Sequence, residues 1–333
     1  MSSSTTTTPV TTPASAPTTS RSSLVSSSRL LEFAMFGVLA LLIVIATIIY
    51  PAFLTPGNIG IILTQIAPLG IVAVGMTLVI IAGGFDLSVG AVFACAATLY
   101  TAIADRWTPG GAMVAALGLA TVLGLVNGLV VTKLRVNPFI TTLGTSSLYS
   151  GGVLFLTNAG SFSNTGEYFQ AIGRGSIAGI RIPVVLLILA FLAGTIILDR
   201  TKFGRGIFAV GGSREAARLS GISVDVVQGS TYVISGFLAG LAGVITAGQV
   251  GAGQGSMGAT IALDAIAIVV IGGTSLRGGE GRIWRTAVGM AIIAVLNNIF
   301  ISLAVDNNIQ LVAKGLIVIL AVAADQLVRR SKR

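Results

Sequence analysis

The sequence predicts an all-α protein that crosses a membrane many times, and three observations support this fold class. Apolar residues make up 54% of the 333 residues and charged residues only 9%, whereas soluble domains carry about 25% charged residues. Long stretches such as residues 36–50 and 184–198 contain no charge, which is typical of membrane-spanning helices. The polar residues gather in short segments between the apolar ones.

The ionisable residues argue against several functions. The chain has no histidine and only eleven acidic residues, so it lacks the commonest metal ligand and the commonest general base. We therefore expect no catalytic site, no metal site and no cofactor bound by this chain. Its net charge of +9 is spread over short loops between apolar segments. That pattern fits a membrane protein in contact with lipid better than a nucleic-acid-binding protein.

The N-terminal region differs in composition from the remainder of the chain. Residues 1–28 are mainly Ser, Thr, Pro and Ala, a composition that does not form a packed core. We predict a disordered cytoplasmic tail over residues 1–28 and one transmembrane domain over residues 29–333. The polar tail is too long for a signal peptide, so the apolar segment after it is expected to be an uncleaved first helix.

About ten helices are expected in the transmembrane domain. Segments 88–104 and 260–274 are shorter than the roughly 20 residues of a full crossing, so we expect these two to be broken or re-entrant. Prolines fall at or near several boundaries, where they cost little. The predicted segments are residues 31–50, 59–82, 88–104, 111–132, 138–157, 182–198, 226–246, 260–274, 285–304 and 308–327.

Basic residues predict the side of the membrane that each loop faces. With the N-terminus inside, sixteen of the twenty Lys and Arg residues fall in inner segments and three in outer segments. Cytoplasmic loops carry such an excess of positive charge. We therefore expect both termini, and the polar segment between residues 199 and 225, to face the cytoplasm.

That polar segment contains the signals of a short helix. A polar residue suited to the N-cap is followed by an acidic residue in the first turn, where the helix dipole favours an anion. Good helix formers come next, and a glycine stands where the helix should stop. The residues concerned are Ser213, Glu215, Ala216, Ala217, Leu219 and Gly221. This helix either docks on a partner or lies at the membrane interface without one.

A second motif, Gly83 to Gly90, separates the second and third apolar segments. The pair Gly83 and Gly84 allows the chain to leave helical geometry. We expect Asp86 to cap the next helix, with Ser88 in its first turn. Two interpretations remain open, a capped cytoplasmic turn and a break that supports a transport pathway or gate.

Further polar residues inside apolar segments are candidates for a pathway. Hydroxyl and amide groups there either bond helices together or face a polar path, and an acidic residue at membrane depth indicates function unless it caps a helix at the outer face. These candidates are Asn127, Thr141, Thr142, Thr145, Asp264 and Thr274. Residues 79–90 and 269–281 also resemble one another, as equivalent breaks in two halves of a transporter would.

Together these motifs resemble the permease of ribose-type ABC sugar importers, in the family that includes branched-chain amino-acid permeases. Residues 83–90, GGFDLSVG, are similar to the family's GGIDLSVG signature, with Phe85 in place of isoleucine. Residues 138–145, residues 272–276 and the order Glu215-Ala216-Ala217 followed by Gly221 also match its patterns. The resemblance covers most of residues 35–325.

The resemblance implies a type II ABC importer fold in the cytoplasmic membrane of a bacterium. The chain would form an alternating-access pathway for a monosaccharide and would carry out no chemistry. Its implied partners are a second permease copy, identical or not, an extracytoplasmic sugar-binding protein and a cytoplasmic ATPase with tandem nucleotide-binding domains for ATP and Mg²⁺. The Glu215 helix would dock on that ATPase.

Two other functions remain open at this stage. One is a branched-chain amino-acid permease of the same family. The other is a secondary transporter driven by an ion gradient, which would need intramembrane carboxylates such as Asp86 or Asp264 as coupling sites.

Overall fold

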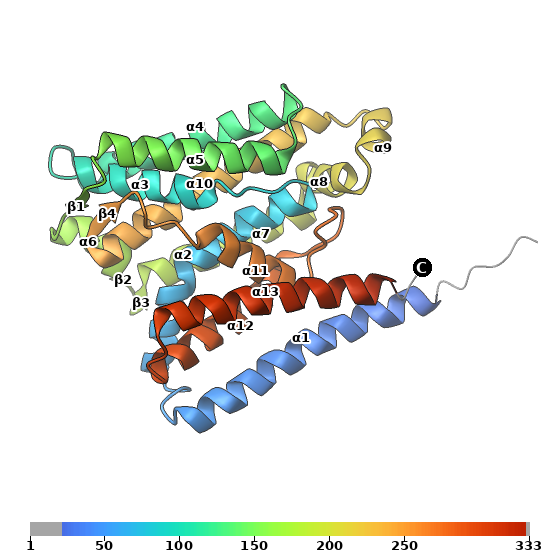
Figure 1. The fold of residues 1–333 in the computed structure, drawn as a ribbon, viewed down its shortest axis with the longest axis horizontal. Coiled ribbons are helices and arrows are strands. Elements are labelled where there is room, and N and C mark those ends of the chain that lie inside the picture. The colour runs from blue at the N-terminus through green and yellow to red at the C-terminus, as the bar shows by residue number, and fades with distance from the viewer. Residues whose placement is uncertain (1–21, 331–333) are drawn as a thin grey trace, which may run out of the picture.

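The computed structural model describes the backbone of residues 22–330, which forms a helical bundle with a few short strands (Figure 1). The helices are α1 (Ser22–Ile49), α2 (Pro56–Ile81), α3 (Val89–Ile103), α4 (Pro109–Thr132), α5 (Pro138–Leu156), α6 (Glu167–Arg174), α7 (Ile182–Arg200), α8 (Lys202–Gly212), α9 (Arg214–Leu219), α10 (Val224–Val250), α11 (Ile261–Ile271), α12 (Ile283–Ser302) and α13 (Asn307–Arg330). The strands are β1 (Ser161–Ser163), β2 (Ser176–Ile177), β3 (Ile180–Arg181) and β4 (Ala252–Gln254).

Each of the ten predicted apolar segments coincides with one helix, so the all-α membrane fold is confirmed. Among the described residues, six helices are long and apolar enough to cross a bilayer, namely α2, α4, α5, α7, α10 and α12. Helix α1 begins at Ser22, ahead of the predicted end of the tail at residue 28, and residues 1–21 lie outside the described part of the chain.

The two segments predicted to be broken are indeed short helices. Helix α3 has 15 residues and α11 has 11, so at 1.5 Å per residue they span about 22 and 16 Å of a hydrocarbon core that is roughly 30 Å thick. Small residues such as Ala94, Ala96 and Ala97 let α3 pack closely against its neighbours, and almost the whole helix is buried.

Helices α2, α3 and α10 form the centre of the bundle. Helices α4 and α5 lie on one side of this centre, and α1, α12 and α13 lie on the other (Figure 1). Helices on the outside, such as α5 and α7, expose large apolar side chains, among them Leu148, Leu189 and Ile196. Exposed aliphatic side chains on long helices are expected where the surrounding medium is lipid.

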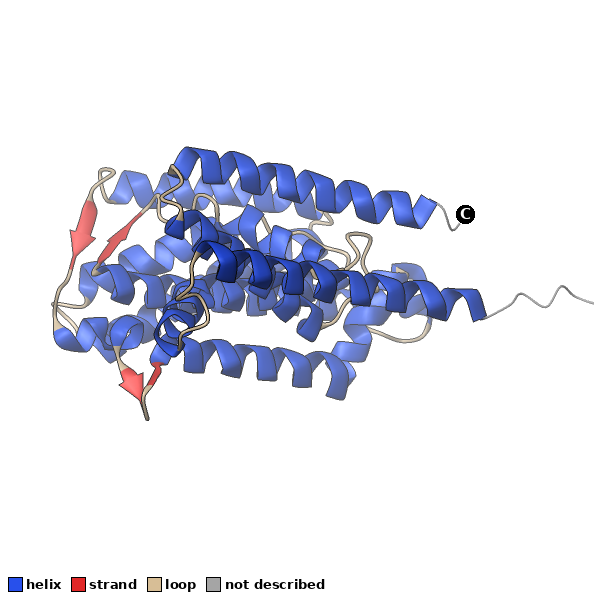
Figure 2. Cartoon of the chain, turned by 90° about the horizontal axis from the view of Figure 1, so that it is seen from below, coloured by secondary structure: helices blue, strands red, loops and turns tan. Residues whose placement is uncertain are grey.

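The two ends of the bundle differ in structure. Strands β1 and β4 pair antiparallel and join the segments that follow α5 and α10, and with α6 and the β2–β3 hairpin they lie at one end (Figure 2). Helices α8 and α9 lie at the other end, together with the beginning of α1 and the end of α13 (Figure 1).

Two helices, α6 and α8, fall in segments that the sequence analysis left as loops. Helix α8 starts after Thr201, whose side chain accepts a hydrogen bond from the backbone of Gly204 at 3.0 Å, and it buries Ile207 and Val210 three residues apart. Helix α6 has only eight residues and buries Phe169. Both are short amphipathic helices whose apolar residues are too few to stand out beside the membrane spans.

Candidate functional site

Helix α9 has the ends that the sequence predicts. The Ser213 side chain accepts a hydrogen bond from the backbone N–H of Ala216 at 3.3 Å, which caps the helix. At the other end Gly221 adopts a left-handed φ of 80°, and the backbone N–H of Ile222 donates to the carbonyl of Ala217 at 3.0 Å. Glycine suits this position because it has no Cβ to strain the turn. The predicted helix and both of its boundaries are confirmed.

One face of α9 is anchored and the other is free. The Ala217 side chain is only 3% exposed and packs in an apolar cluster with Leu78 and Ile81 from the end of α2. Leu219 is 81% exposed, and Glu215 is exposed as well. The helix is therefore fixed to the bundle by one face while its opposite face stays exposed.

Glycines from three segments meet where α9 joins the bundle, and we call Gly83, Gly211, Gly278 and Gly279 the glycine junction. The backbone N–H of Gly279 donates to the carbonyl of Ile81 at 2.8 Å. A Cβ on Gly278 would lie 2.9 Å from the Cα of Gly83 and 3.0 Å from the carbonyl oxygen of Gly211. A Cβ on Gly211 would overlap the carbonyl of Ile81. The ends of α2 and α8 and the loop after α11 are thus in backbone contact.

The repeat suggested by residues 79–90 and 269–281 extends to backbone geometry. Gly83, two residues after the last residue of α2, has a φ of 77°, and Gly273, two residues after the last residue of α11, has a φ of 75°. In each case the following residue donates to the carbonyl five positions earlier, Gly84 to Val79 at 2.9 Å and Thr274 to Val269 at 3.2 Å. Both helices therefore end in the same Schellman motif.

Asp86 belongs to a buried polar network. It is 1% exposed, and its Oδ1 atom accepts hydrogen bonds from the backbone N–H of Ser88 at 3.1 Å and from the Ser88 hydroxyl at 2.6 Å. Its Oδ2 atom accepts one from the hydroxyl of Ser235 on α10 at 2.9 Å. The prediction that Asp86 caps the next helix is wrong, because α3 begins at Val89 with Ser88 as its N-cap.

The same network joins four parts of the bundle. The Asn127 amide, on α4, donates to the Ser88 hydroxyl at 2.6 Å, and Tyr149 on α5 donates to the Asn127 carbonyl at 3.3 Å. The backbone carbonyl of Phe85 accepts from the hydroxyl of Thr142 at 3.2 Å and from that of Tyr232 at 3.3 Å. Asn127 therefore bonds helices together, which is one of its two predicted roles.

The remaining threonines do not converge on one site. The Thr145 hydroxyl bonds to the carbonyl of Thr142 within its own helix. Thr141 and Thr274 are buried, and their hydroxyls have no hydrogen-bond partner within the described residues. Thr274 lies in the turn after α11, beside Gly281. Thr141 and Thr145 lie about one turn apart on α5, whereas Thr274 belongs to a different part of the bundle.

Asp264 lies in the first turn of α11, where its side chain is 15% exposed. Gly258, just before α11, packs against Gly90 in the first turn of the buried helix α3 so closely that neither has room for a Cβ. The start of α11 is therefore in contact with the start of α3. An Oδ2 atom of Asp264 lies 4.0 Å from the Nζ atom of Lys314 on α13. Pairing with a cation offsets part of the cost of a partly buried carboxylate.

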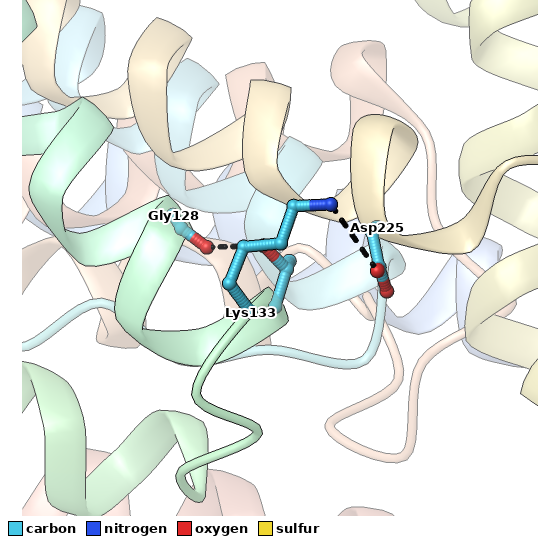
Figure 3. A network of polar contacts seen from close by, with 4 residues as sticks. Gly128, Lys133 and Asp225 are labelled. Atoms are coloured by element: carbon cyan, nitrogen blue, oxygen red, sulfur yellow. Dashed lines mark hydrogen bonds and ion pairs between the residues drawn. The ribbon is translucent and has the colours of Figure 1, made fainter.

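A second ion pair lies near the end of the bundle that carries α9. The Lys133 Nζ atom, at the end of α4, lies 3.8 Å from an Oδ2 atom of Asp225 in the first turn of α10 (Figure 3). Both side chains are well exposed, so solvent screens the attraction and the pair adds little stability. The pair places the end of α4 beside the first turn of α10.

The fold and these sites define a multi-pass helical membrane protein of the transport class. It has an anchored, partly exposed helix between two spans, buried helix breaks, and few ionisable groups. Residues 58–322 match the family model described as the branched-chain amino acid transport system / permease component. The chain belongs to this family, whose members are transport components and not enzymes.

Several curated relatives cover nearly the whole chain. The ribose import permease protein of Bacillus subtilis (strain 168) is 41% identical over 291 residues, which are 86% of this chain and 90% of the relative. That of Haemophilus influenzae is 38% identical over 91% of this chain and 95% of the relative. The D-allose transport system permease protein of Escherichia coli (strain K12) is 34% identical, over 90% and 93%. The comparison with solved structures gave no match.

Proposed function

We propose that this chain is the transmembrane permease of an ABC importer for a monosaccharide in the cytoplasmic membrane of a bacterium. One observation carries the proposal: relatives named for ribose and allose transport align with almost the whole chain at 34–41% identity. Ribose is the first substrate to test.

The geometry supports a coupling role for α9. Its exposed side carries Glu215 and Leu219, which offer a charge and an apolar contact to a cytoplasmic ATPase. Its buried residue Ala217 belongs to an apolar cluster with residues of α8, α10 and the end of α2, and α9 itself packs against α8 and α10. Through Gly211, near the end of α8, the glycine junction connects this region to the end of α2 and to the loop after α11. A displacement of α9 by the ATPase would therefore act on both helix breaks.

The implied assembly is that of an ABC importer. We expect a partner ATPase with tandem nucleotide-binding domains that bind ATP and Mg²⁺, a second permease copy, and an extracytoplasmic protein that delivers the sugar. The basic residues predict that α9 and both chain termini face the cytoplasm. This orientation would place α9 on the side where ATP is available.

A branched-chain amino acid is the second candidate substrate, because the family description names that class. An ion-gradient-driven mechanism is less well supported. Asp264 is paired with Lys314, and Asp86 is held by hydrogen bonds from Ser88 and Ser235.

Uptake by the complete importer in proteoliposomes tests the proposal. We expect radiolabelled ribose, or another of a panel containing xylose and galactose, to accumulate only with ATP on the ATPase side and with the binding protein on the other. An ionophore that collapses ion gradients should not alter the rate. Uptake of leucine without any sugar would contradict the substrate class, and uptake that follows an ion gradient without ATP would contradict the mechanism.

A further inference from the structure

A cavity of about 190 Å³ lies between the first half of α2, the second half of α12 and the beginning of α13. Its volume is below the roughly 300–1,000 Å³ of pockets for drug-sized ligands, so it suits a small solute. Isoleucines of α2 and α12 form the apolar part of its wall. The polar part consists of Gln65, Asn297, Asn298, Gln310 and Lys314.

Two amide oxygens at this cavity accept no hydrogen bond from the described residues. Asn298 is 8% exposed, and its Nδ2 atom donates to Asn58 at 3.3 Å. The Oδ1 atoms of Asn297 and Asn298 are buried and accept no hydrogen bond from the described residues. An amide oxygen removed from water without a donor is unfavourable. The cavity therefore favours an occupant that can donate hydrogen bonds to these two amide oxygens.

The charges at the cavity favour a neutral occupant. The Lys314 Nζ atom, which belongs to the wall, lies 4.0 Å from the Asp264 carboxylate. The two opposite charges largely compensate one another, so the cavity favours an occupant without a net charge. Amides with apolar walls instead match a solute that has hydroxyl groups and an apolar ring face.

We propose that this cavity is a binding site for the monosaccharide ring on its way through the permease, with Asn297 and Asn298 accepting hydrogen bonds from its hydroxyls. The inference rests on the proposed function for the identity of the solute. It assigns a role to residues of α12 that the sequence motifs do not include. Ordered water is the competing occupant.

Ribose uptake by the complete importer separates the two occupants. We expect Asn297→Leu and Asn298→Leu to reduce uptake about tenfold or more, because the lost contacts are buried hydrogen bonds. The matched control is Asn308→Leu, which changes an exposed amide at the start of α13. Its uptake should match that of the unmodified chain. Unaltered uptake in both α12 variants would overturn the site.

A second measurement guards against loss of folding. In a Cys95→Ser background, Ala294→Cys, at a residue that lines the cavity but is not a proposed ligand, and Asn308→Cys are labelled with a small thiol reagent in the importer, with and without saturating ribose. We expect ribose to slow labelling at position 294 and to leave position 308 unaffected. Equal labelling rates at position 294 with and without ribose would overturn the proposal and indicate water. Failure of the unmodified importer to take up any sugar would instead refute the proposed function.

Discussion

Gly211 lies close in the chain to α9, the helix that we propose binds the ATPase, and its backbone contacts the segments that follow α2 and α11. It is the second-last residue of α8, two positions before the N-cap of α9. Its Cα faces the carbonyl of Ile81 and the backbone N–H of Gly279 with no space for a side-chain atom. A single methyl group at this position would have to separate α8 from both segments. Gly212, the next residue, has nothing within 4 Å of the position of a Cβ.

These neighbouring glycines give a matched pair of substitutions. We expect Gly211→Ala to destabilise the protein by about 1–3 kcal/mol, the usual range for overpacking, and to reduce transport. Gly212→Ala should leave both nearly unchanged. The apparent Tm of each purified variant and its uptake rate are the measurements. Equal effects of the two substitutions would show that close backbone contact at the junction is unimportant.

Ser88 links two halves of the buried polar network. Its hydroxyl donates to Asp86 and accepts from Asn127, so Ser88→Ala leaves the buried Asn127 amide without this acceptor and removes one of the three hydrogen bonds to Asp86. We expect a loss of about 1–3 kcal/mol in the free energy of unfolding, measured as a lower Tm. Ser147→Ala is the control, because the Ser147 hydroxyl is exposed and bonds only to the carbonyl of Leu143 in its own helix. If the two variants have the same Tm, the hydrogen bonds of the Ser88 hydroxyl do not contribute to stability.

For helix α9, the local sequence predicts where the helix begins and ends but not which of its faces is buried. Ser213 and Gly221 set its ends, and both were evident from the sequence. Its burial was not evident, since Ala216 and Ala217 are equally good helix formers and only Ala217 is buried. The exposure of Leu219 follows from this orientation, because Leu219 lies on the opposite side of the helix from Ala217, and the Ala217 side faces α8 and α10.

Leu219 therefore tests the role of the element. We expect Leu219→Glu to weaken binding of the ATPase by about 2 kcal/mol or more, as for a central apolar contact of an interface, while the membrane domain keeps its Tm. Leu303→Glu is the control, since Leu303 is also exposed but follows α12 at the opposite end of the bundle. Copurification of the two permease variants with the ATPase is compared. If Leu219→Glu copurifies with as much ATPase as the unmodified permease, α9 is not part of the interface.

The sequence predicted elements better than it predicted contacts. All ten apolar segments are helices because runs of apolar residues leave few other structures in a bilayer. The short lengths of α3 and α11 were also evident, and so were the glycine breaks. The glycine junction was not, because it depends on three segments far apart in the chain. The cavity was missed for the same reason, since Gln65 and Asn298 approach one another only when α2 packs on α12.

The whole molecule has two unlike ends, and its function depends on their orientation. One end holds the paired strands β1 and β4, and the other holds α9 with the beginning of α1 and the end of α13 (Figure 1). Sixteen of the twenty basic residues fall in the segments predicted to face the cytoplasm, and the α9 segment is one of them. Cytoplasmic placement of the α9 end is the central claim, because an ATPase can dock only there.

Labelling of single cysteines tests this claim most directly. In a Cys95→Ser background, Ser213→Cys in the N-cap of α9 and Ser163→Cys in β1 each place one thiol at an exposed position at opposite ends of the bundle. An impermeant thiol reagent is added to intact cells and, separately, to permeabilised cells. We predict that position 163 reacts in intact cells, whereas position 213 reacts only after permeabilisation. Labelling of position 213 in intact cells would place α9 outside the cell and contradict the coupling of this permease to ATP.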